Sequence, residues 1–337
     1  MKKIEPLNLK DLKTYSLPGR HSKVSRRDFG RAWEKGGTFK DFVARLPKIL
    51  AGDTLRAVAA AWVAARRQGR QVLLGMGAHP IKVGLSPILI DLMRRNLITG
   101  LALNGAGVVH DVEIAMVGCT SEDVDQVLGC GQFGMARETA EFINNAISWG
   151  AGQGLGLGEA VGLRLMDSDF PFKEESLLRA ASELSLPLTV HVAVGTDIVH
   201  LHPSVNPEAL GAATHYDFRL FAALVSRLAQ GVYLNLGSAV IMPEVFLKAL
   251  TLARNLGHQV SPLTTVNLDF IQHYRPLTNV VRRPTAASGR GYALTGHHEL
   301  LLPMLAALVI EEMEDDHAHG NRDSGKCLAS GRASQRL

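Results

Sequence analysis

The chain has 337 residues, of which 46% are hydrophobic and 20% are charged, as is usual for a globular protein. Its formal net charge is only +4, and its Lys and Arg residues gather near both ends without interleaved aromatic residues, which argues against nucleic-acid binding. No segment resembles a signal peptide, and no uninterrupted apolar run approaches the roughly 20 residues of a membrane span. Three cysteines without metal-binding spacing favour a cytoplasmic location.

The composition divides the chain into three parts. Residues 1–37 are polar and interrupted by Gly and Arg, and we interpret them as an N-terminal arm that is either packed on a neighbouring subunit or poorly ordered. Residues 38–315 carry regular apolar patterns and are expected to form a single domain. Residues 316–337 are rich in Ser, Gly, Arg and His, a composition that predicts a disordered tail.

Short apolar runs alternate with amphipathic ones along the central part. The apolar runs predict at least five buried strands, at residues 71–74, 98–103, 187–194, 232–236 and 261–269. The amphipathic runs predict helices at residues 38–50, 53–67, 86–95, 120–150 with a break at 129–134, 174–184, 212–229, 243–255 and 297–311, and another helix directly after the second strand. Because the strands are apolar throughout, we expect an α/β fold with a mostly parallel sheet and helices on both faces.

Two strand-to-helix turns in this pattern are rich in glycine. The first has the sequence GMGAHPIKVG (residues 75–84) and the second has NGAG (residues 104–107). Glycine lets backbone N–H groups approach a ligand, helix N-termini favour anions, and ligands of parallel sheets bind at the carboxyl ends of strands. The candidate cofactor-binding residues here are Gly77, His79, Lys82, Asn104, Gly105, Ala106, Gly107, His110 and Asp111.

Other polar residues follow later strands. Asp197, His200 and His202 come after the strand at 187–194, and their spacing also suits a metal site, because both His side chains can reach one ion. Asn267 and Asp269 end the strand at 261–269 and complete the predicted cofactor-binding set.

Two further stretches are interpreted as connections. The segment 270–295 has a loop-like composition, and its three arginines suit a carboxylate or phosphate clamp: Arg282, Arg283 and Arg290. The Gly-dense segment 150–158 follows no strand, so we interpret it as a helix–helix connection rather than a phosphate loop.

These motifs resemble those of deoxyhypusine synthase and its structural relatives over about residues 70–270. In that family a strand runs into Thr-Ala-Gly-Gly-Val-Glu-Glu-Asp, and the matching stretch here is Asn-Gly-Ala-Gly-Val-Val-His-Asp at 104–111. A family motif with Gly-Asp-Met-Ile, then His, then Asn-Pro is similar to residues 196–207. The motif Asn-Ala-Leu-Ala-x-His-Asp-Ile-Glu of NAD-dependent, archaeal-type ornithine cyclodeaminase also resembles residues 104–113.

One family motif is altered. The family has Gly-Gly-Gly-Val-Val-Lys-His-His, whose Lys forms a Schiff base, whereas residues 237–244 are Gly-Ser-Ala-Val-Ile-Met-Pro-Glu. The nearby Lys248 lies further along the next predicted helix. An apolar side chain cannot form an imine, so the transfer step of deoxyhypusine synthase is in doubt, although its NAD half-reaction does not need this lysine.

The resemblance implies NAD as the cofactor and an amine or basic amino acid as the substrate. Hydride abstraction would give an imine that is then transferred, cyclised or deaminated. By this resemblance His202 is the catalytic base, and Asp197 and Glu113 hold a substrate cation. It also implies a homotetramer built as a dimer of dimers. Two alternatives stay open, namely a non-catalytic NAD or nucleotide binder and a metal-dependent hydrolase built on Asp197, His200 and His202.

Overall fold

The structure, a computed structural model that describes residues 4–323, divides the chain into two compact units, Met1–Asp53 and Thr54–Leu337. The first unit is exposed along most of residues 4–38. Its helices are the 3-10 turns η1 (Leu17–Gly19) and η2 (Arg26–Asp28), then α1 (Phe39–Arg45) and the first residues of α2 (Leu50–Arg67). A capping box starts α1, because the Thr38 side chain accepts a hydrogen bond from the Asp41 N–H and the Asp41 carboxylate accepts one from the Thr38 N–H.

The second unit contains a six-stranded, all-parallel sheet in the order β3-β2-β1-β4-β5-β6. The strands are β1 (Val72–Met76), β2 (Gly100–Asn104), β3 (Leu188–His191), β4 (Val232–Leu236), β5 (Leu263–Asp269) and β6 (Gly289–Thr295). The chain builds the sheet outward from β1 to β3, returns to the middle and continues from β4 to β6. This is the strand order of dinucleotide-binding folds, whose switch point lies here between β1 and β4. The predicted α/β fold class is confirmed.

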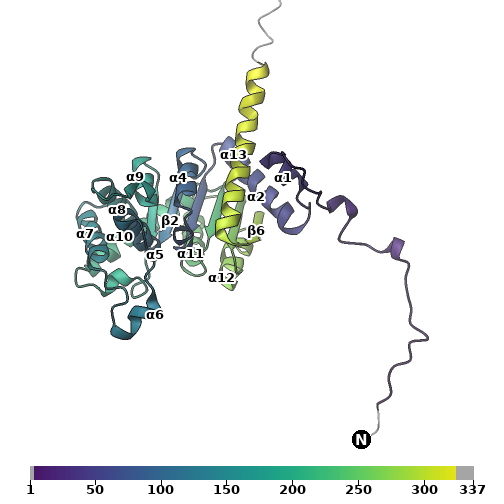
Figure 1. Cartoon of the computed structure of the whole chain (residues 1–337), viewed down its shortest axis with the longest axis horizontal. Helices are drawn as coiled ribbons and strands as arrows, with labels where there is room; N and C mark the ends of the chain where they lie inside the picture. Colours follow the sequence, from purple (N-terminus) through teal and green to yellow (C-terminus); the bar gives the residue numbers. More distant parts are fainter. Residues whose placement is uncertain (1–3, 324–337) are drawn as a thin grey trace, which may run out of the picture. The chain divides into compact units, whose positions relative to one another are not determined.

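Helices cover both faces of the sheet (Figure 1). After α2, those before β3 are α3 (His79–Lys82), α4 (Ser86–Arg94), α5 (Gly105–Val117), α6 (Val124–Val127), the 3-10 turn η3 (Leu128–Cys130), α7 (Arg137–Gly152), α8 (Leu157–Met166), the 3-10 turn η4 (Lys173–Glu175) and α9 (Leu177–Glu183). Those after β3 are the 3-10 turn η5 (Ile198–Leu201), α10 (Pro207–Val225), α11 (Ile241–Asn255), α12 (Tyr274–Pro276), the π-helical η6 (Leu277–Arg282) and α13 (His298–Asp323). Helix α4 connects β1 to β2 and α11 connects β4 to β5, so the two connections run in opposite directions along the sheet. Because connections between parallel strands are right-handed, these two helices lie on opposite faces.

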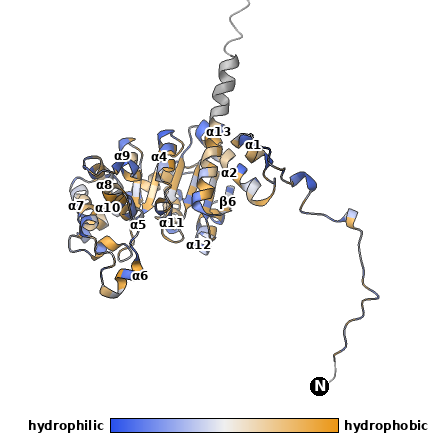
Figure 2. Ribbon diagram, viewed as in Figure 1, coloured by the Kyte–Doolittle hydropathy of each residue, from blue (hydrophilic) through white to orange (hydrophobic). Residues whose placement is uncertain are grey.

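The apolar character of the strands explains their burial (Figure 2). Every residue of β1 and β4 is buried. On one face, Leu73 and Tyr233 of these strands pack in a cluster with Phe221 of α10 and Phe246 of α11. The Tyr233 and Phe246 rings stack with their centroids 3.8 Å apart. Burial of these large side chains is the main favourable term for the sheet and its helices.

One strand was not predicted, because β6 forms part of the segment 270–295 that we interpreted as a loop. Only Leu294 of its seven residues is buried, since β6 is the last strand of the sheet. An edge strand of this kind lacks the continuous apolar run of a central one. The three arginines of the segment are spread over two elements: Arg282 and Arg283 belong to the helical part, where they donate to Thr278 and Asn279, and Arg290 lies in β6.

The Gly-dense segment 150–158 connects α7 to α8, so this prediction is confirmed. Asp217 of α10 fastens the connection, because its carboxylate accepts hydrogen bonds from the backbone N–H groups of Gly158 (2.9 Å) and Val190 of β3 (2.7 Å). Burial raises the pKa of Asp217 to about 7, against the opposing effect of these hydrogen bonds. Helix α8 itself was not predicted.

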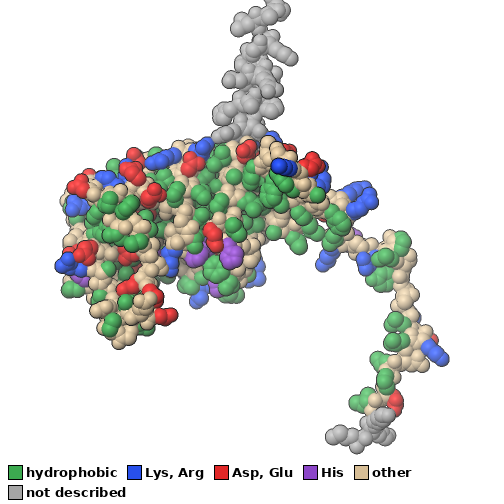
Figure 3. All heavy atoms as spheres, in the orientation of Figure 1, with side chains coloured by type: hydrophobic (Ala, Val, Ile, Leu, Met, Phe, Trp, Pro, Cys, Tyr) green, Lys and Arg blue, Asp and Glu red, His purple; other side chains and the backbone are tan. Residues whose placement is uncertain are grey.

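The last helix reaches into the predicted tail. Helix α13 extends to Asp323, and the rest of that tail, residues 324–337, lies outside the described residues. Among the helices of residues 4–323, none is both long and apolar enough to cross a membrane. On the face drawn in Figure 3, basic and acidic side chains of the described residues are interspersed rather than separated into stripes.

Two helical glycines give a test of the packing between α7 and α8. A Cβ at Gly150 would overlap the Cβ of Ala160, whereas a Cβ at the exposed Gly211 in α10 would meet nothing within 4 Å. We expect Gly150→Ala to lower the free energy of unfolding by about 1–3 kcal/mol through overpacking. Gly211→Ala should raise it by about 0.5–1 kcal/mol because alanine favours the helix. Urea unfolding followed by circular dichroism measures both, and a stabilised Gly150→Ala variant would contradict the packing.

Candidate functional site

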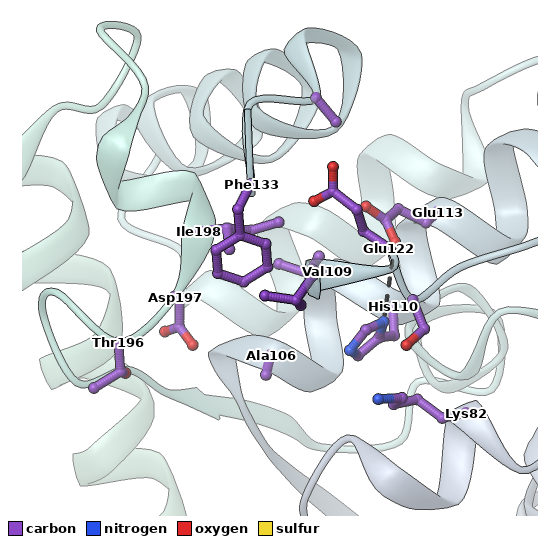
Figure 4. Close-up of a pocket in the computed structure, with 13 residues that line it drawn as sticks. Lys82, Ala106, Val109, His110, Glu113, Glu122, Phe133, Thr196, Asp197 and Ile198 are labelled. Atoms are coloured by element: carbon purple, nitrogen blue, oxygen red, sulfur yellow. Dashed lines mark ion pairs between the residues drawn. The ribbon is translucent and has the colours of Figure 1, made fainter. Parts of the chain in front are cut away.

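A cavity of about 400 Å³ lies where the segments after β1, β2 and β3 meet (Figure 4). Its walls come from α3, the first half of α5, the segment 121–136 and the loop after β3. The lining residues are Lys82, Ala106, Val109, His110, Glu113, Ser121, Glu122, Val124, Phe133, Ala136, Thr196, Asp197 and Ile198. The structure therefore brings together five predicted site residues, which are Lys82, Ala106, His110, Glu113 and Asp197.

Asp197 lies against the N-terminus of α5. A Cβ at Gly105 would overlap its Oδ2 atom, so glycine at this position lets the carboxylate approach the helix end. Asp197 is 7% exposed, and burial raises the pKa of its carboxyl to about 6, while the hydrogen bond from the Ala106 N–H opposes the rise. Its Oδ2 atom has no hydrogen-bond partner, and the likewise unpartnered Nε2 of His200 is 4.0 Å away. One buried oxygen beside the cavity is thus left without a hydrogen-bond partner.

His110 and Glu113, one helical turn apart on α5, are joined through Thr120. The Thr120 hydroxyl donates to Glu113 Oε2 and lies 2.6 Å from His110 Nδ1. Because this hydroxyl uses its proton on the carboxylate, His110 Nδ1 is the donor and Nε2 carries the lone pair. Burial, and then Lys82, lower the pKa of His110 to about 4, so the ring is neutral at pH 7. His110 is therefore an acceptor of hydrogen bonds.

The segment 118–136, which we predicted as a helix from residue 120 with a break at 129–134, closes one side of the cavity. It contains only α6 and the 3-10 turn η3 before α7 begins. Glu122 fixes it by accepting a hydrogen bond from the Gly134 N–H (2.9 Å), and Phe133 faces the cavity (Figure 4). The break predicted from the glycines at 129, 131 and 134 is confirmed, whereas the helix predicted before it is limited to α6.

The charges of the cavity are mostly negative. Three carboxylates, those of Glu113, Glu122 and Asp197, line it together with the single ammonium of Lys82. Apolar side chains, among them Val109 and Phe133, complete the wall. A pocket of this kind suits a small molecule with an apolar stem and a positive charge.

Two predicted cofactor residues serve the fold. The carboxylate of Asp111 caps α9 by accepting hydrogen bonds from the Leu177 N–H (2.7 Å), the Leu178 N–H (3.2 Å) and the Ser176 hydroxyl. The side chain of Asn104 caps α5 and accepts from the Gly107 N–H (3.0 Å). Neither Asp111 nor Asn104 lines the cavity, and Gly107 is held by the same cap.

His202, the predicted base, does not line the cavity either. Its Nδ1 atom accepts a hydrogen bond from the Ser204 N–H (3.2 Å). The Nδ1 atom of His200 accepts from the Gly195 N–H (3.2 Å). Among the side chains described for residues 4–313, no group of three or more His, Cys, Asp or Glu residues is arranged to hold a metal ion. Asp197, His200 and His202 therefore do not form the trio that the hydrolase alternative needs.

The remaining predicted residues lie at the switch point or on strand β5, outside the cavity. Gly77 contacts the turn after β4, because a Cβ there would overlap the Gly237 carbonyl oxygen. Asn267 accepts a hydrogen bond from the Asn235 side chain inside the sheet. His79 and Asp269 gather around His298, which the sequence analysis did not identify.

The position of the family's imine-forming lysine is held by Met242, which is fully buried at the start of α11. Lys248, further along the same helix, forms an ion pair with Glu244. None of residues 237–244, all of which the structure describes, lines the cavity.

No protein-family model and no curated protein sequence matches the chain. Solved structures do match it. A candidate deoxyhypusine synthase from Entamoeba histolytica superposes with a TM-score of 0.52 at 12% identity, over 84% of this chain and 96% of that chain. The chain has a deoxyhypusine synthase-like fold. A candidate LOR/SDH protein from Methanococcus maripaludis S2 gives a TM-score of 0.50 at 12% identity, over 79% of this chain and 71% of that chain.

A third match is AgrE in a ternary complex with ornithine and NAD+, with a TM-score of 0.52 at 17% identity. It covers 80% of this chain and 35% of AgrE, so the chain spans about a third of the length of AgrE.

The buried carboxyl of Asp197 gives a pH-dependent prediction for stability. In the unfolded chain it ionises near pH 4, whereas in the folded chain its pKa is about 6. The folded state thus keeps a proton that the unfolded state has lost, and stability falls as the pH rises from about 4 to above 6. Asp197→Asn removes this contribution. Between about pH 4 and pH 6, the free energy of unfolding should therefore decrease by about 2–3 kcal/mol less in the variant than in wild type.

Urea unfolding at several pH values measures the difference, with Asp125→Asn on the exposed α6 as the control. Parallel pH profiles for wild type and Asp197→Asn would show that the carboxyl is not buried as described.

Proposed function

We propose that the chain is an NAD-dependent enzyme that oxidises an amine or a basic amino acid. The observation that carries this proposal is the cavity, in which three carboxylates and one exposed lysine surround about 400 Å³ of space where the segments after β1, β2 and β3 meet. A cationic substrate would be held there by Asp197 and Glu113. The strand order supports the cofactor, because sheets of this order bind dinucleotides at the carboxyl ends of their strands.

The structural matches support the same proposal at the level of the fold. AgrE, which has been crystallised with ornithine and NAD+, is similar in fold to this chain. The candidate deoxyhypusine synthase is similar over almost its whole length. At 12–17% identity these matches support the fold alone. The substrate class is therefore inferred from the charges of the cavity.

The residues at the switch point fit a dinucleotide. The turns after β1 and β4 touch through backbone at Gly77 and Gly237, so no side chain of either glycine stands between a ligand and the peptide groups. The exposed Lys82, the last residue of α3, would neutralise a phosphate. When bound, NAD would supply the hydride acceptor for the substrate carbon.

The roles of the cavity residues follow from their protonation. Above pH 6 the Asp197 carboxylate is ionised, and its negative charge at the cavity wall would attract a substrate ammonium. Neutral His110 would accept one further N–H from the substrate at Nε2. Phe133 and Val109 would pack on the aliphatic stem and exclude water. The predicted dimer of dimers stays a prediction, which light scattering of the purified protein tests.

Calorimetry with NAD and then with ornithine tests the proposal. We expect NAD to bind, and we expect ornithine to bind the NAD-loaded protein with release of NADH, followed by absorbance. Binding of NAD with no turnover of ornithine, arginine or simple diamines would favour the non-catalytic alternative. If NAD does not bind at millimolar concentration, the assignment of NAD as the cofactor is wrong.

The cavity charges give a second, separate prediction. Binding of ornithine should strengthen as the pH rises through about 6, because Asp197 must lose its proton to attract the ammonium. Asp197→Asn and Glu113→Gln should each weaken binding about tenfold to hundredfold, as expected for the loss of a charged hydrogen-bond partner. The exposed Glu183→Gln, at the end of α9, is the control and should bind like wild type. Unchanged ornithine affinity in both cavity variants would place the substrate elsewhere.

A further inference from the structure

A second polar cluster lies outside the cavity, at the carboxyl ends of β1, β5 and β6. It consists of His79, the first residue of α3, Asp269, the last residue of β5, and His298, the first residue of α13. None of these three residues lines the cavity. They come from three separate segments, so only the folded sheet brings them together.

The three side chains form a chain of contacts that leads from the surface inward. The Nδ1 atoms of His79 and His298 are 2.8 Å apart, and His298 Nε2 is 3.7 Å from Asp269 Oδ1. His298 is fully buried and Asp269 nearly so, whereas His79 is half-buried. The cluster therefore has a closed end at Asp269 and an open end at His79.

The neighbouring residues hold the rings over the end of β4. A Cβ at Gly237 would lie 2.7 Å from His298 Cε1, so glycine makes room for this ring. Phe270 packs against both imidazoles, with ring centroids 5.4 Å from His79 and 5.7 Å from His298. The position of His79 beside the switch point puts it next to the backbone turns that we assign to the cofactor.

The distances decide where the protons lie. Two Nδ1 atoms at 2.8 Å form a hydrogen bond, so one ring donates and the other accepts. If His298 donated, the lone pair on its Nε2 would face the Asp269 carboxylate, which is repulsive. If His79 donates, His298 carries its proton on Nε2 and that N–H faces the carboxylate, which is attractive even at 3.7 Å. The second arrangement is favoured, and it leaves the lone pair of His79 on Nε2, at the open end.

We propose that His79, His298 and Asp269 form a proton relay in which His79 Nε2 is the catalytic proton acceptor for a ligand group lying over the end of β4. This inference rests on the proposed function for the identity of that ligand, which would be the reacting amine. His298 and Asp269 are positioning residues, because they reach the ligand only through His79.

The step is a proton transfer. An N–H bond of the ligand breaks, the proton moves to His79 Nε2, and the electron pair stays on the ligand nitrogen. The resulting imidazolium keeps its Nδ1 proton on His298, and a hydrogen bond from a charged donor is stronger than one from a neutral ring. Burial lowers the pKa of His298, Asp269 raises it, and the neighbouring His79 lowers it again, so the neutral state of His298 in the relay agrees with its surroundings. Neutral His110 in the cavity is a poor substitute, since burial and Lys82 hold its pKa near 4.

Imidazole ¹⁵N spectra of the protein without ligand test the relay directly. We expect His79 to be protonated on Nδ1 and bare on Nε2, which is the minor tautomer of free histidine, and His298 to be protonated on Nε2. In Asp269→Asn the preference of His298 for protonation on Nε2 should be lost, and with it the preference of His79 for protonation on Nδ1. A wild-type His79 protonated on Nε2 overturns the proposal. This wild-type spectrum decides the matter even if a variant fails to fold.

Turnover provides the second readout. His79→Gln should lower kcat about 100-fold or more, as expected for loss of a general base, with little change in KM. His297→Gln, which changes the exposed histidine next to His298, is the control and should retain full kcat. Full kcat in His79→Gln overturns the catalytic role. Correct tautomers without turnover of any amine leave the relay standing and count against the proposed function instead.

Discussion

The parallel sheet reverses its direction of growth between β1 and β4, and the arrangement of polar residues depends on that reversal. Segments after β1, β2 and β3 pass to one side, and segments after β4, β5 and β6 pass to the other. The turns at Gly77 and Gly237 touch where the two sets part. Because all strands point the same way, each polar residue that follows a strand arrives at the same edge, and the reversal decides which of them become neighbours.

Three buried carboxylates lie at helix N-termini but have different roles. Asp111, Asp197 and Asp217 each lie at the N-terminus of a helix, where backbone N–H groups and the helix dipole favour an anion. Asp111 and Asp217 each accept at least two backbone hydrogen bonds and join elements distant in the chain. Of these three carboxylates only Asp197 lines the cavity, which is why we assign it, together with Glu113, to a ligand.

The two polar clusters flank the switch point and have complementary properties. The cavity beside α5 is rich in carboxylates and suits the binding of a cation. The cluster of His79, His298 and Asp269 has no open carboxylate, but it presents a bare imidazole nitrogen backed by a negative charge. Lys82 and His79 lie at opposite ends of the four-residue helix α3, so this short element links both sides. A substrate held by its charge on one side would react on the other.

Local signals in the sequence were sufficient for the fold class, for five of the six strands and for the glycine turns. Burial on both faces leaves continuous apolar runs, and the carboxyl ends of such runs are where Asp197 and the turn before Lys82 appear. The edge strand β6 was not predicted because only one of its residues is buried, so its sequence has no continuous apolar run.

Which polar residues meet was decided by the tertiary structure alone. His79 and His298 are 219 positions apart, so no spacing connects them, and Thr120 joins His110 to Glu113 only because the segment 118–136 folds back over α5. Asp111 and Asp197 look alike as acids near strand ends, yet one caps a helix and the other faces a cavity. Sequence places a residue on an element, but the hydrogen bonds that occupy or free its side chain come from elements brought alongside by folding.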